Sequence, residues 1–268
     1  MIAFPHSKLN LGLSIVSKRT DGFHNLETIF YPLPLRDVLE IVPSEGLEFI
    51  QTGLEIPGKA KDNLALRAYR SLKAKYPQME PVKIYLHKAI PVGSGLGGGS
   101  ADASELILLL NDLFKVKMSL ADLYAFALEL GSDCPFFMQS SPCYASGRGE
   151  ILEPLSLDLS AYSFLLVHPQ ICVDTKWAFS KINPLPPKYD LKESIRQPVQ
   201  KWAQYLFNDF EAPVFAAYPF LKKIKDQLYE AGALFASMTG SGSTIYGIFD
   251  KSFLPEIAVE NTRQTIIP

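Results

Sequence analysis

The sequence predicts an α+β fold in two domains, and three observations support this. Runs with strand character occur in both halves of the chain, and a glycine-rich stretch leads directly into an apolar helical segment. The C-terminal part has the order strand, helices, strand, glycine turn, strand, which is typical of helices packed on one face of a sheet. Many prolines follow residue 150, so we expect a boundary there, with domains at residues 1–155 and 156–268.

The N-terminal part predicts a β-hairpin. Residues 9–16 alternate apolar and polar side chains, which is typical of a strand, and Lys8 and Asn10 then project together from the polar face. A turn signal at residues 20–22 leads into the β-rich residues 26–31. Phe23 and His24 directly follow the turn, and from the residues alone incidental packing is the simpler interpretation of this pair.

A glycine loop joins a predicted strand at residues 82–86 to a predicted helix at residues 101–114, and its seven residues 93–99 include five glycines. Glycine allows positive φ and close backbone approach, and a helix N-terminus attracts anions, so the loop predicts a phosphate site. Ser100 has the position of an N-cap and could also contact a phosphate-bound metal. The predicted binding residues are Pro91, Val92, Gly93, Ser94, Gly95, Leu96, Gly97, Gly98, Gly99, Ser100 and Ala101.

Two generic phosphate loops fit this stretch poorly. Gly99-Ser100-Ala101 lacks the lysine that a Walker A loop needs. Gly93, Gly95 and Gly98 match the dinucleotide-binding spacing, but a second helix at residues 119–130 follows where that fold requires a strand. A dinucleotide site is therefore disfavoured.

The remaining elements follow in order. The second helix ends at Gly131, and Asp133 then precedes a short segment with Pro135 in its first turn. From the residues alone, helix capping is a sufficient role for Asp133. The C-terminal part predicts a glycine turn at Gly240-Ser-Gly242, together with strands and helices at residues 162–168, 199–207, 219–231, 233–238 and 244–249.

The composition excludes several function classes. A net charge of -2 gives no drive toward nucleic acid or an anionic membrane, and no apolar run approaches the length of a membrane span. We expect a cytoplasmic protein without a signal peptide. The cysteines Cys134, Cys143 and Cys172 form no C-x-x-C pair, which favours reduced thiols, and the four histidines lack metal-ligand spacing.

Three separated segments resemble, in order, the motifs of the GHMP small-molecule kinases: Lys8-Leu-Asn10-Leu, the glycine loop from Pro91 to Ala101, and Thr239-Gly-Ser-Gly-Ser243. Residues 21–24, 130–137 and 147–150 most resemble those members that phosphorylate a cytidine diphosphate-linked methylerythritol. The resemblance implies a ribosomal-protein-like N-terminal domain and a ferredoxin-like C-terminal α/β layer domain, with the active site in the cleft between them.

The resemblance also implies roles for the catalytic groups. The glycine loop would bind ATP, Asp133 would accept the proton of the substrate hydroxyl, and Lys8 would orient that hydroxyl. Mg²⁺ is expected with ATP, and Ser100 is the best candidate for a protein ligand. Asp102 would repel phosphate, so we expect it to point away from the loop.

For the substrate, the resemblance implies a cytosine pocket. Phe23 would stack on the base, where the family more often has tyrosine, and His24 would bond its edge. Phe179 would supply the second stacking face, with Trp177 as a competing candidate. Asn10 would bond near the reacting hydroxyl, and the substrate-binding set is completed by Gly240 and Ser241.

Two alternative functions stay open on the sequence. One is another GHMP kinase, of the homoserine or mevalonate type, and the other is a non-catalytic binding module. We expect a small-molecule substrate, no nucleic-acid or membrane partner, and a monomer or weak homodimer. Because few residues follow Phe249, we expect the last helix and strand of this fold to be short or poorly formed.

Overall fold

The protein is described here by a computed structural model that covers residues 1–58, 62–252, 257 and 259–268. Its contacts divide the chain into two compact units, each assembled from separate segments. The first unit comprises Met1–Lys8, Pro32–Val92 and Gly97–Ser140, and the second comprises Leu9–Tyr31, Gly93–Leu96 and Ser141–Pro268. A division of the sequence at residue 155 stays a prediction.

The first unit contains a four-stranded sheet with the order β1-β4-β6-β5. Strand β5 runs parallel to β6, and the other neighbours are antiparallel. Alternate residues of β6 are buried, as expected for a sheet with one covered face. The strands are β1 (Ile2–Ala3), β4 (Val38–Pro43), β5 (Glu48–Gly53) and β6 (Val82–Lys88).

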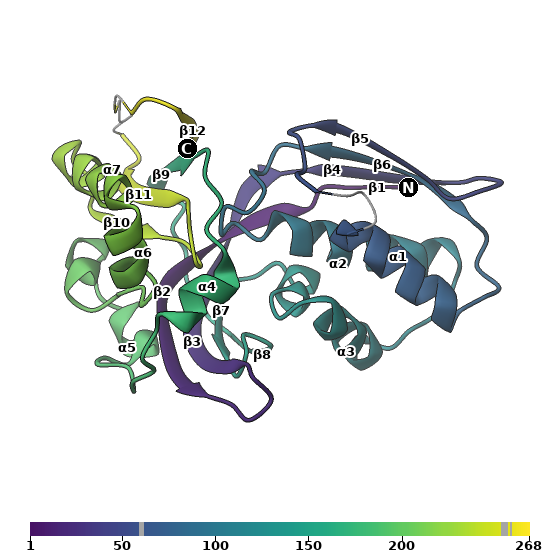
Figure 1. The fold of residues 1–268 in the computed structure, drawn as a ribbon, viewed down its shortest axis with the longest axis horizontal. Helices are drawn as coiled ribbons and strands as arrows, with labels where there is room; N and C mark the ends of the chain where they lie inside the picture. Colours follow the sequence, from purple (N-terminus) through teal and green to yellow (C-terminus); the bar gives the residue numbers. More distant parts are fainter. Residues whose placement is uncertain (59–61, 253–256, 258) are drawn as a thin grey trace. The chain divides into compact units, whose positions relative to one another are not determined.

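Helices cover one face of this sheet (Figure 1). The apolar run of α2 is fully buried at Leu106, Ile107 and Leu110, and it packs with Leu39, Ile84 and other sheet residues in one core. The helices are α1 (Leu64–Lys75), α2 (Gly98–Leu113), α3 (Leu120–Leu130) and a 3₁₀ helix at Cys134–Met138. The sequence placed the start of α2 at residue 101, three residues too late.

The predicted hairpin is confirmed. Strands β2 (His6–Lys18) and β3 (His24–Arg36) are neighbours in a sheet with the order β2-β3-β7-β8, completed by β7 (Cys143–Ser146) and β8 (Ile151–Pro154). The polar face of β2 is also buried, since Lys8 and Asn10 are 3% and 2% exposed. Gly12 has a φ of +77°, and a Cβ there would lie 2.9 Å from Leu191, so this position requires glycine.

The second unit also contains an antiparallel sheet with the order β10-β11-β9-β12. Helix α7, with Leu221, Ile224 and Leu228 buried, packs on β10 and β11 (Figure 1). The elements are β9 (Tyr162–Pro169), β10 (Phe235–Met238), β11 (Ile245–Asp250), β12 (Thr262–Ile267), α4 (Thr175–Ser180), α5 (Leu191–Ser194), α6 (Glu211–Ala217), α7 (Pro219–Glu230) and a 3₁₀ helix at Val199–Gln204.

Two expectations for this part were wrong. Residues 199–207 form only the short 3₁₀ helix, whose proline start and buried Val199 and Trp202 favour a tight turn against the sheet. The last strand is well formed, because β12 pairs with β9 over six residues. The last helix was expected after Phe249, a stretch in which residues 253–256 and 258 lie outside the described residues, so that expectation stays a prediction. None of the described helices has the length and apolar character that crossing a membrane requires.

Candidate active site

Lys8 and Asp133 form an ion pair in the first unit. Lys8 Nζ lies 3.5 Å from Asp133 Oδ2, and the two side chains are 3% and 37% exposed. Burial lowers the pKa of Lys8, and the neighbouring Asp133 carboxylate opposes this shift. A buried ammonium is thus held beside a carboxylate that solvent or a ligand can reach.

Asp133 has the N-cap position of the 3₁₀ helix Cys134–Met138, but its side chain makes no capping hydrogen bond. Its backbone is in the right-handed helical region rather than the extended region that capping residues usually adopt. The interpretation of Asp133 as a cap alone is therefore wrong, because its carboxylate faces Lys8 instead.

Gly97 brings the start of α2 against Lys8. It is the N-cap residue of α2 with a φ of +76°. A Cβ at this position would lie 2.6 Å from Phe137 Cζ and 3.2 Å from Lys8 Cγ, so only glycine fits. The stem of Lys8 thus packs beside a helix N-terminus, where unpaired N–H groups and the helix dipole favour an anion.

We predict that Gly97→Ala weakens ATP binding about tenfold or more, since a methyl group forces a shift of Phe137 or of the loop backbone. The KM for ATP and the affinity for a non-hydrolysable ATP analogue measure this effect. Gly46→Ala is the matched control, because a Cβ at exposed Gly46 meets nothing within 4 Å. Equal ATP affinity in the two variants would contradict the prediction.

Ser100 is not the N-cap of α2, because the helix begins at Gly98 and places Ser100 in its first turn. The Ser100 side chain instead lies close enough to the Cys134 thiol to lower the pKa of that thiol. Burial raises the pKa of this thiol to about 11, which keeps it protonated. A role for Ser100 as a metal ligand stays a prediction, and the described residues contain no cluster of three or more His, Cys, Asp or Glu side chains suited to a metal.

Residues of the three sequence motifs meet within the second unit. Thr239 Oγ1 lies 3.3 Å from Asn10 Oδ1 and 3.2 Å from the Gly95 carbonyl oxygen. A Cβ on Gly240 would come within 3.3 Å of Gly95 Cα, so the backbones of the two glycine segments approach closely. Asn10 Nδ2 donates to Thr28 Oγ1 at 3.0 Å. The side chain of Asn10 therefore fixes this junction, and its contact with substrate stays a prediction.

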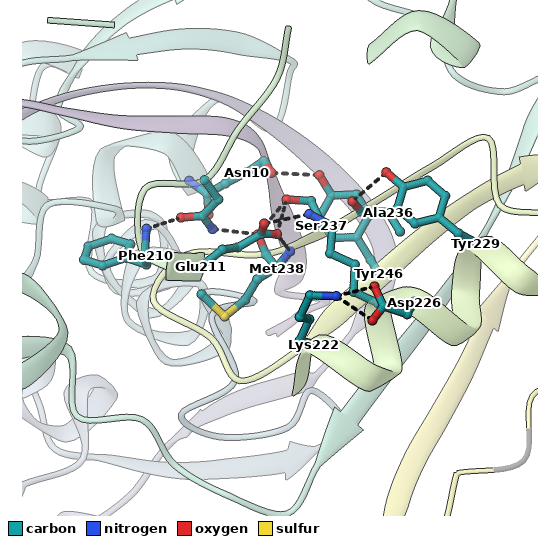
Figure 2. A network of polar contacts seen from close by, with 12 residues as sticks. Asn10, Phe210, Glu211, Lys222, Asp226, Tyr229, Ala236, Ser237, Met238 and Tyr246 are labelled. Carbon is teal, nitrogen blue, oxygen red and sulfur yellow. Dashed lines mark hydrogen bonds and ion pairs between the residues drawn. The ribbon is translucent and has the colours of Figure 1, made fainter. Parts of the chain in front are cut away.

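A polar network supports the glycine turn after β10, and Figure 2 shows its members around Met238. Glu211 Oε1 accepts from the backbone N–H of Met238 at 2.8 Å, and the Tyr246 hydroxyl donates to the Asn10 carbonyl at 3.0 Å. Asn208 Nδ2 donates to the carbonyls of Met238 and Gly240, at 2.7 and 2.9 Å. Asn208 and Glu211 were not predicted, because they lie between predicted helices without a local motif.

The aromatic candidates lie close together in the second unit. His24 and Phe179 stack with ring centroids 4.9 Å apart and an interplanar angle of 18°. Phe23 is 47% exposed, and the Arg148 guanidinium carbon lies 3.6 Å from its ring centroid. Trp177 makes an edge contact with Tyr218 instead. The structure thus brings Phe179, not Trp177, to His24, and Ser241 bonds Thr175 at the start of the same helix α4.

Asp102 forms a buried ion pair with Lys88, and its orientation away from the loop stays a prediction. It is buried, and its Oδ2 accepts from Lys88 Nζ at 2.7 Å. Lys88 also donates to Asp37, which gives a buried cluster of two carboxylates and one ammonium. Lys88 and Asp37 were not predicted, because neither belongs to a recognisable motif.

Comparison with known proteins identifies the family. Models of the GHMP kinases N terminal domain and the GHMP kinases C terminal domain match residues 63–141 and 191–264. A 4-diphosphocytidyl-2-C-methyl-D-erythritol kinase from Parabacteroides distasonis is 48% identical over 251 residues, which cover 94% of this chain and 92% of the relative.

Comparison with solved structures supports the same family. A crystal structure of 4-(cytidine 5'-diphospho)-2C-methyl-D-erythritol kinase matches with a TM-score of 0.77 and 32% identity, covering 92% of this chain and 90% of that one. The Methanococcus jannaschii mevalonate kinase matches with a TM-score of 0.67 but 14% identity, covering 94% and 91%, which shows a shared fold alone. The chain therefore belongs to the GHMP kinases, within the family of the 4-diphosphocytidyl-2-C-methyl-D-erythritol kinases.

Proposed function

We propose that this kinase transfers the γ-phosphoryl group of ATP to the 2-hydroxyl of 4-diphosphocytidyl-2-C-methyl-D-erythritol. The observation that carries the proposal is the Lys8–Asp133 pair next to the glycine-rich start of α2. Phosphoryl transfer depends mostly on positioning and on compensation of charge, and this arrangement offers an ammonium, a carboxylate and helix N–H groups. The names of relatives at 48% identity support the choice of substrate.

In the proposed mechanism, Asp133 accepts the proton of the substrate hydroxyl as the new O–P bond forms. Lys8 holds the hydroxyl oxygen and offsets its developing negative charge. The first-turn N–H groups of α2 bind phosphate oxygens. A base positioned for proton transfer contributes typically about 10²–10⁴-fold to the rate.

We propose that Mg²⁺ accompanies ATP. The ion usually keeps several waters and binds mainly through phosphate oxygens, so it does not need a cluster of protein carboxylates. The Ser100 hydroxyl in the first turn of α2 is a suitable oxygen donor for the ion. When bound, the ion would neutralise charge on the transferring phosphates.

Phe23, His24 and Phe179 are the proposed cytosine site. All three rings lie in the second unit, and Phe23 is exposed. Phe179 stacks on His24 and the Arg148 guanidinium lies over the Phe23 ring, so we propose that the cytosine takes the place of these partners. Burial lowers the pKa of His24, with a smaller effect of Lys18 in the same direction, which favours the neutral ring that can accept a hydrogen bond.

We predict that Phe23→Ala raises the KM for the cytidine substrate about tenfold, since base stacking is worth roughly 1–3 kcal/mol, and leaves kcat nearly unchanged. Steady-state kinetics at saturating ATP measure both values. Phe220→Ala on α7 is the matched control, because Phe220 is also exposed, at 41%. A KM that stays at the wild-type value in Phe23→Ala would show that Phe23 does not contribute to substrate binding.

ADP release with ATP and Mg²⁺ tests the proposed function as a whole. The acceptors are the cytidyl methylerythritol diphosphate, homoserine, mevalonate and galactose. Turnover of the cytidine compound alone is the expected result. Turnover of another acceptor would support kinase activity but contradict the proposed cytosine site. No turnover with any acceptor would favour a non-catalytic binding module.

A further inference from the structure

His6 and Lys8 lie two residues apart on β2, so their side chains project from the same face of the strand. Lys8 pairs with Asp133, and His6 packs against the 3₁₀ helix Cys134–Met138 that follows Asp133. His6 is 7% exposed, and all of these residues belong to the first unit. The same face of β2 therefore contacts both the proposed base and the helix at whose start that base lies.

The His6 ring packs against two phenylalanines of this helix. Its centroid lies 5.8 Å from that of Phe136, with an interplanar angle of 83°, and 5.2 Å from that of Phe137, with an angle of 52°. The two phenylalanine rings make an edge contact with their centroids 5.1 Å apart. Phe137 also lies against Gly97 at the start of α2, where a Cβ would meet Phe137 Cζ at 2.6 Å. Because this packing leaves little free space, a change at His6 is transmitted to the helix.

The two ring nitrogens of His6 have different partners. Nδ1 lies 2.8 Å from the Ser7 carbonyl oxygen, and Nε2 lies 3.0 Å from Ser140 Oγ. A carbonyl oxygen can only accept, so Nδ1 carries the proton of the neutral ring and Nε2 accepts from the Ser140 hydroxyl. Burial lowers the pKa of His6, the bond to the Ser7 carbonyl opposes this shift, and Arg36 adds to the lowering. Burial and Arg36 thus favour the neutral ring that accepts from Ser140.

Ser140 lies just beyond the end of the same helix. Gln139 is the C-cap, and Ser140 follows with a φ of +53°, in the left-handed region that residues other than glycine rarely adopt. The Ser140 N–H donates to the Phe136 carbonyl at 3.3 Å, and the Ser140 hydroxyl bonds His6. Because such a conformation persists only where other contacts hold it, the bond to His6 stabilises the turn that ends the helix.

The orientation of Asp133 depends on how this helix lies against β2. The Asp133 side chain makes no capping hydrogen bond in the helix, and its Oδ2 lies 3.5 Å from Lys8 Nζ. The segment from Asp133 to Ser140 is therefore held to one face of β2 at both ends, by Lys8 at its start and by His6 at its end.

We propose that His6 is a positioning residue for Asp133, which it places against the acceptor hydroxyl through its bond to Ser140 and its packing on the Cys134–Met138 helix. The inference rests on the proposed function, in which Asp133 accepts the proton of that hydroxyl. A displacement of about 1 Å at a reacting group can lower the rate by about 10²-fold. Loss of the His6–Ser140 bond should therefore lower kcat and leave the KM for ATP nearly unchanged.

Ser140→Ala and His6→Phe remove this bond from its two sides. Alanine keeps the Cβ at a left-handed position, and phenylalanine keeps an aromatic ring against the helix. We expect each variant to lower kcat about tenfold. The double variant should lose no more than either single variant, since both remove the same bond. His6→Gln keeps an acceptor near the position of Nε2, and its kcat should be closer to the wild-type value than that of His6→Phe.

Ser71→Ala on α1 and His87→Phe on β6 are the matched controls, because both residues are exposed in the same unit, and both variants should keep the wild-type kcat. The helix is also attached to α2, since Ser104 Oγ donates to the Cys134 carbonyl at 2.8 Å, so we expect the variants to fold. Melting temperatures check this, and Ser140→Ala decides the test if His6→Phe does not fold. A wild-type kcat in Ser140→Ala would overturn the proposal.

The Asp133→Asn variant separates positioning from a general structural role. If His6 acts through Asp133, Ser140→Ala should lower the single-turnover rate of the wild type and leave that of Asp133→Asn unchanged. An equal loss in both backgrounds would overturn the proposal and assign the His6–Ser140 bond to the stability of the first unit. A near-normal rate for Asp133→Asn alone would instead contradict the proposed function of Asp133 as the base, and this result does not depend on Ser140→Ala.

Discussion

Asp133→Asn is expected to lower kcat about a thousandfold, which is the loss typical of a positioned general base. Asparagine keeps the shape of aspartate and an oxygen that can accept from Lys8 Nζ, now 3.5 Å from Asp133 Oδ2. It cannot take the proton of the acceptor hydroxyl. The effect therefore falls on the chemical step, and affinity for ATP should stay close to that of the wild type.

Single-turnover phosphorylation and calorimetric titration with an ATP analogue separate these two effects. Asp112→Asn is the matched control, because Asp112 is an exposed carboxylate on α2 in the same unit. Asp112→Asn should keep wild-type turnover. A near-normal rate for Asp133→Asn would remove Asp133 from the mechanism, whereas loss of ATP binding would assign it to the nucleotide site.

Local patterns predicted the elements that carry the candidate site. Alternation in β2 placed Lys8 and Asn10 on one buried face, and glycine content predicted a tight loop before α2. These predictions succeeded because a strand or a glycine loop is specified by neighbouring residues. The same reasoning could place Asp133 only at a helix start, since its partner Lys8 is far away in the sequence.

The start of α2 shows where local rules fail. Glycine costs about 1 kcal/mol relative to alanine inside a helix, so the sequence favoured a start after Gly99 and a cap at Ser100. The structure begins the helix at Gly98 because left-handed Gly97 makes the turn and Gly98 packs closely against Ile90 and Lys88. Tertiary packing therefore overrides the local propensity.

The buried charge cluster could not be predicted from local patterns at all. Lys88 and Asp37 are 51 residues apart, and each resembles an ordinary charged residue at the end of a strand. Asn208 presents the same problem, since its bonds to Met238 and Gly240 span 30 and 32 residues. Long-range polar contacts of this kind depend on the three-dimensional arrangement, and a single sequence carries no period or motif for them.

Lys8→Met is expected to lower kcat about 10²–10⁴-fold without loss of stability. Methionine keeps an unbranched stem beside Gly97 but removes the ammonium that offsets negative charge in the transition state. Burial of that ammonium is unfavourable, as the lowered pKa of Lys8 indicates, and Asp133 is exposed enough to stay hydrated without it. The free energy of unfolding should therefore be equal to or higher than that of the wild type.

The pH dependence of stability gives an independent check that the buried ammonium of Lys8 is unfavourable for folding. Because the pKa of Lys8 is lowered in the folded protein, the unfolded chain binds more protons between the folded value and the ordinary value of 10.5. The contribution of Lys8 to the free energy of unfolding therefore rises with pH across that range, and Lys8→Met should lack this rise. Urea denaturation at several alkaline pH values and kcat at neutral pH measure the two effects. Lys75→Met at the end of α1 is the exposed control and should change neither. A Lys8→Met variant that is less stable yet fully active would assign Lys8 to the core of the first unit and leave the proposed reaction without its cation.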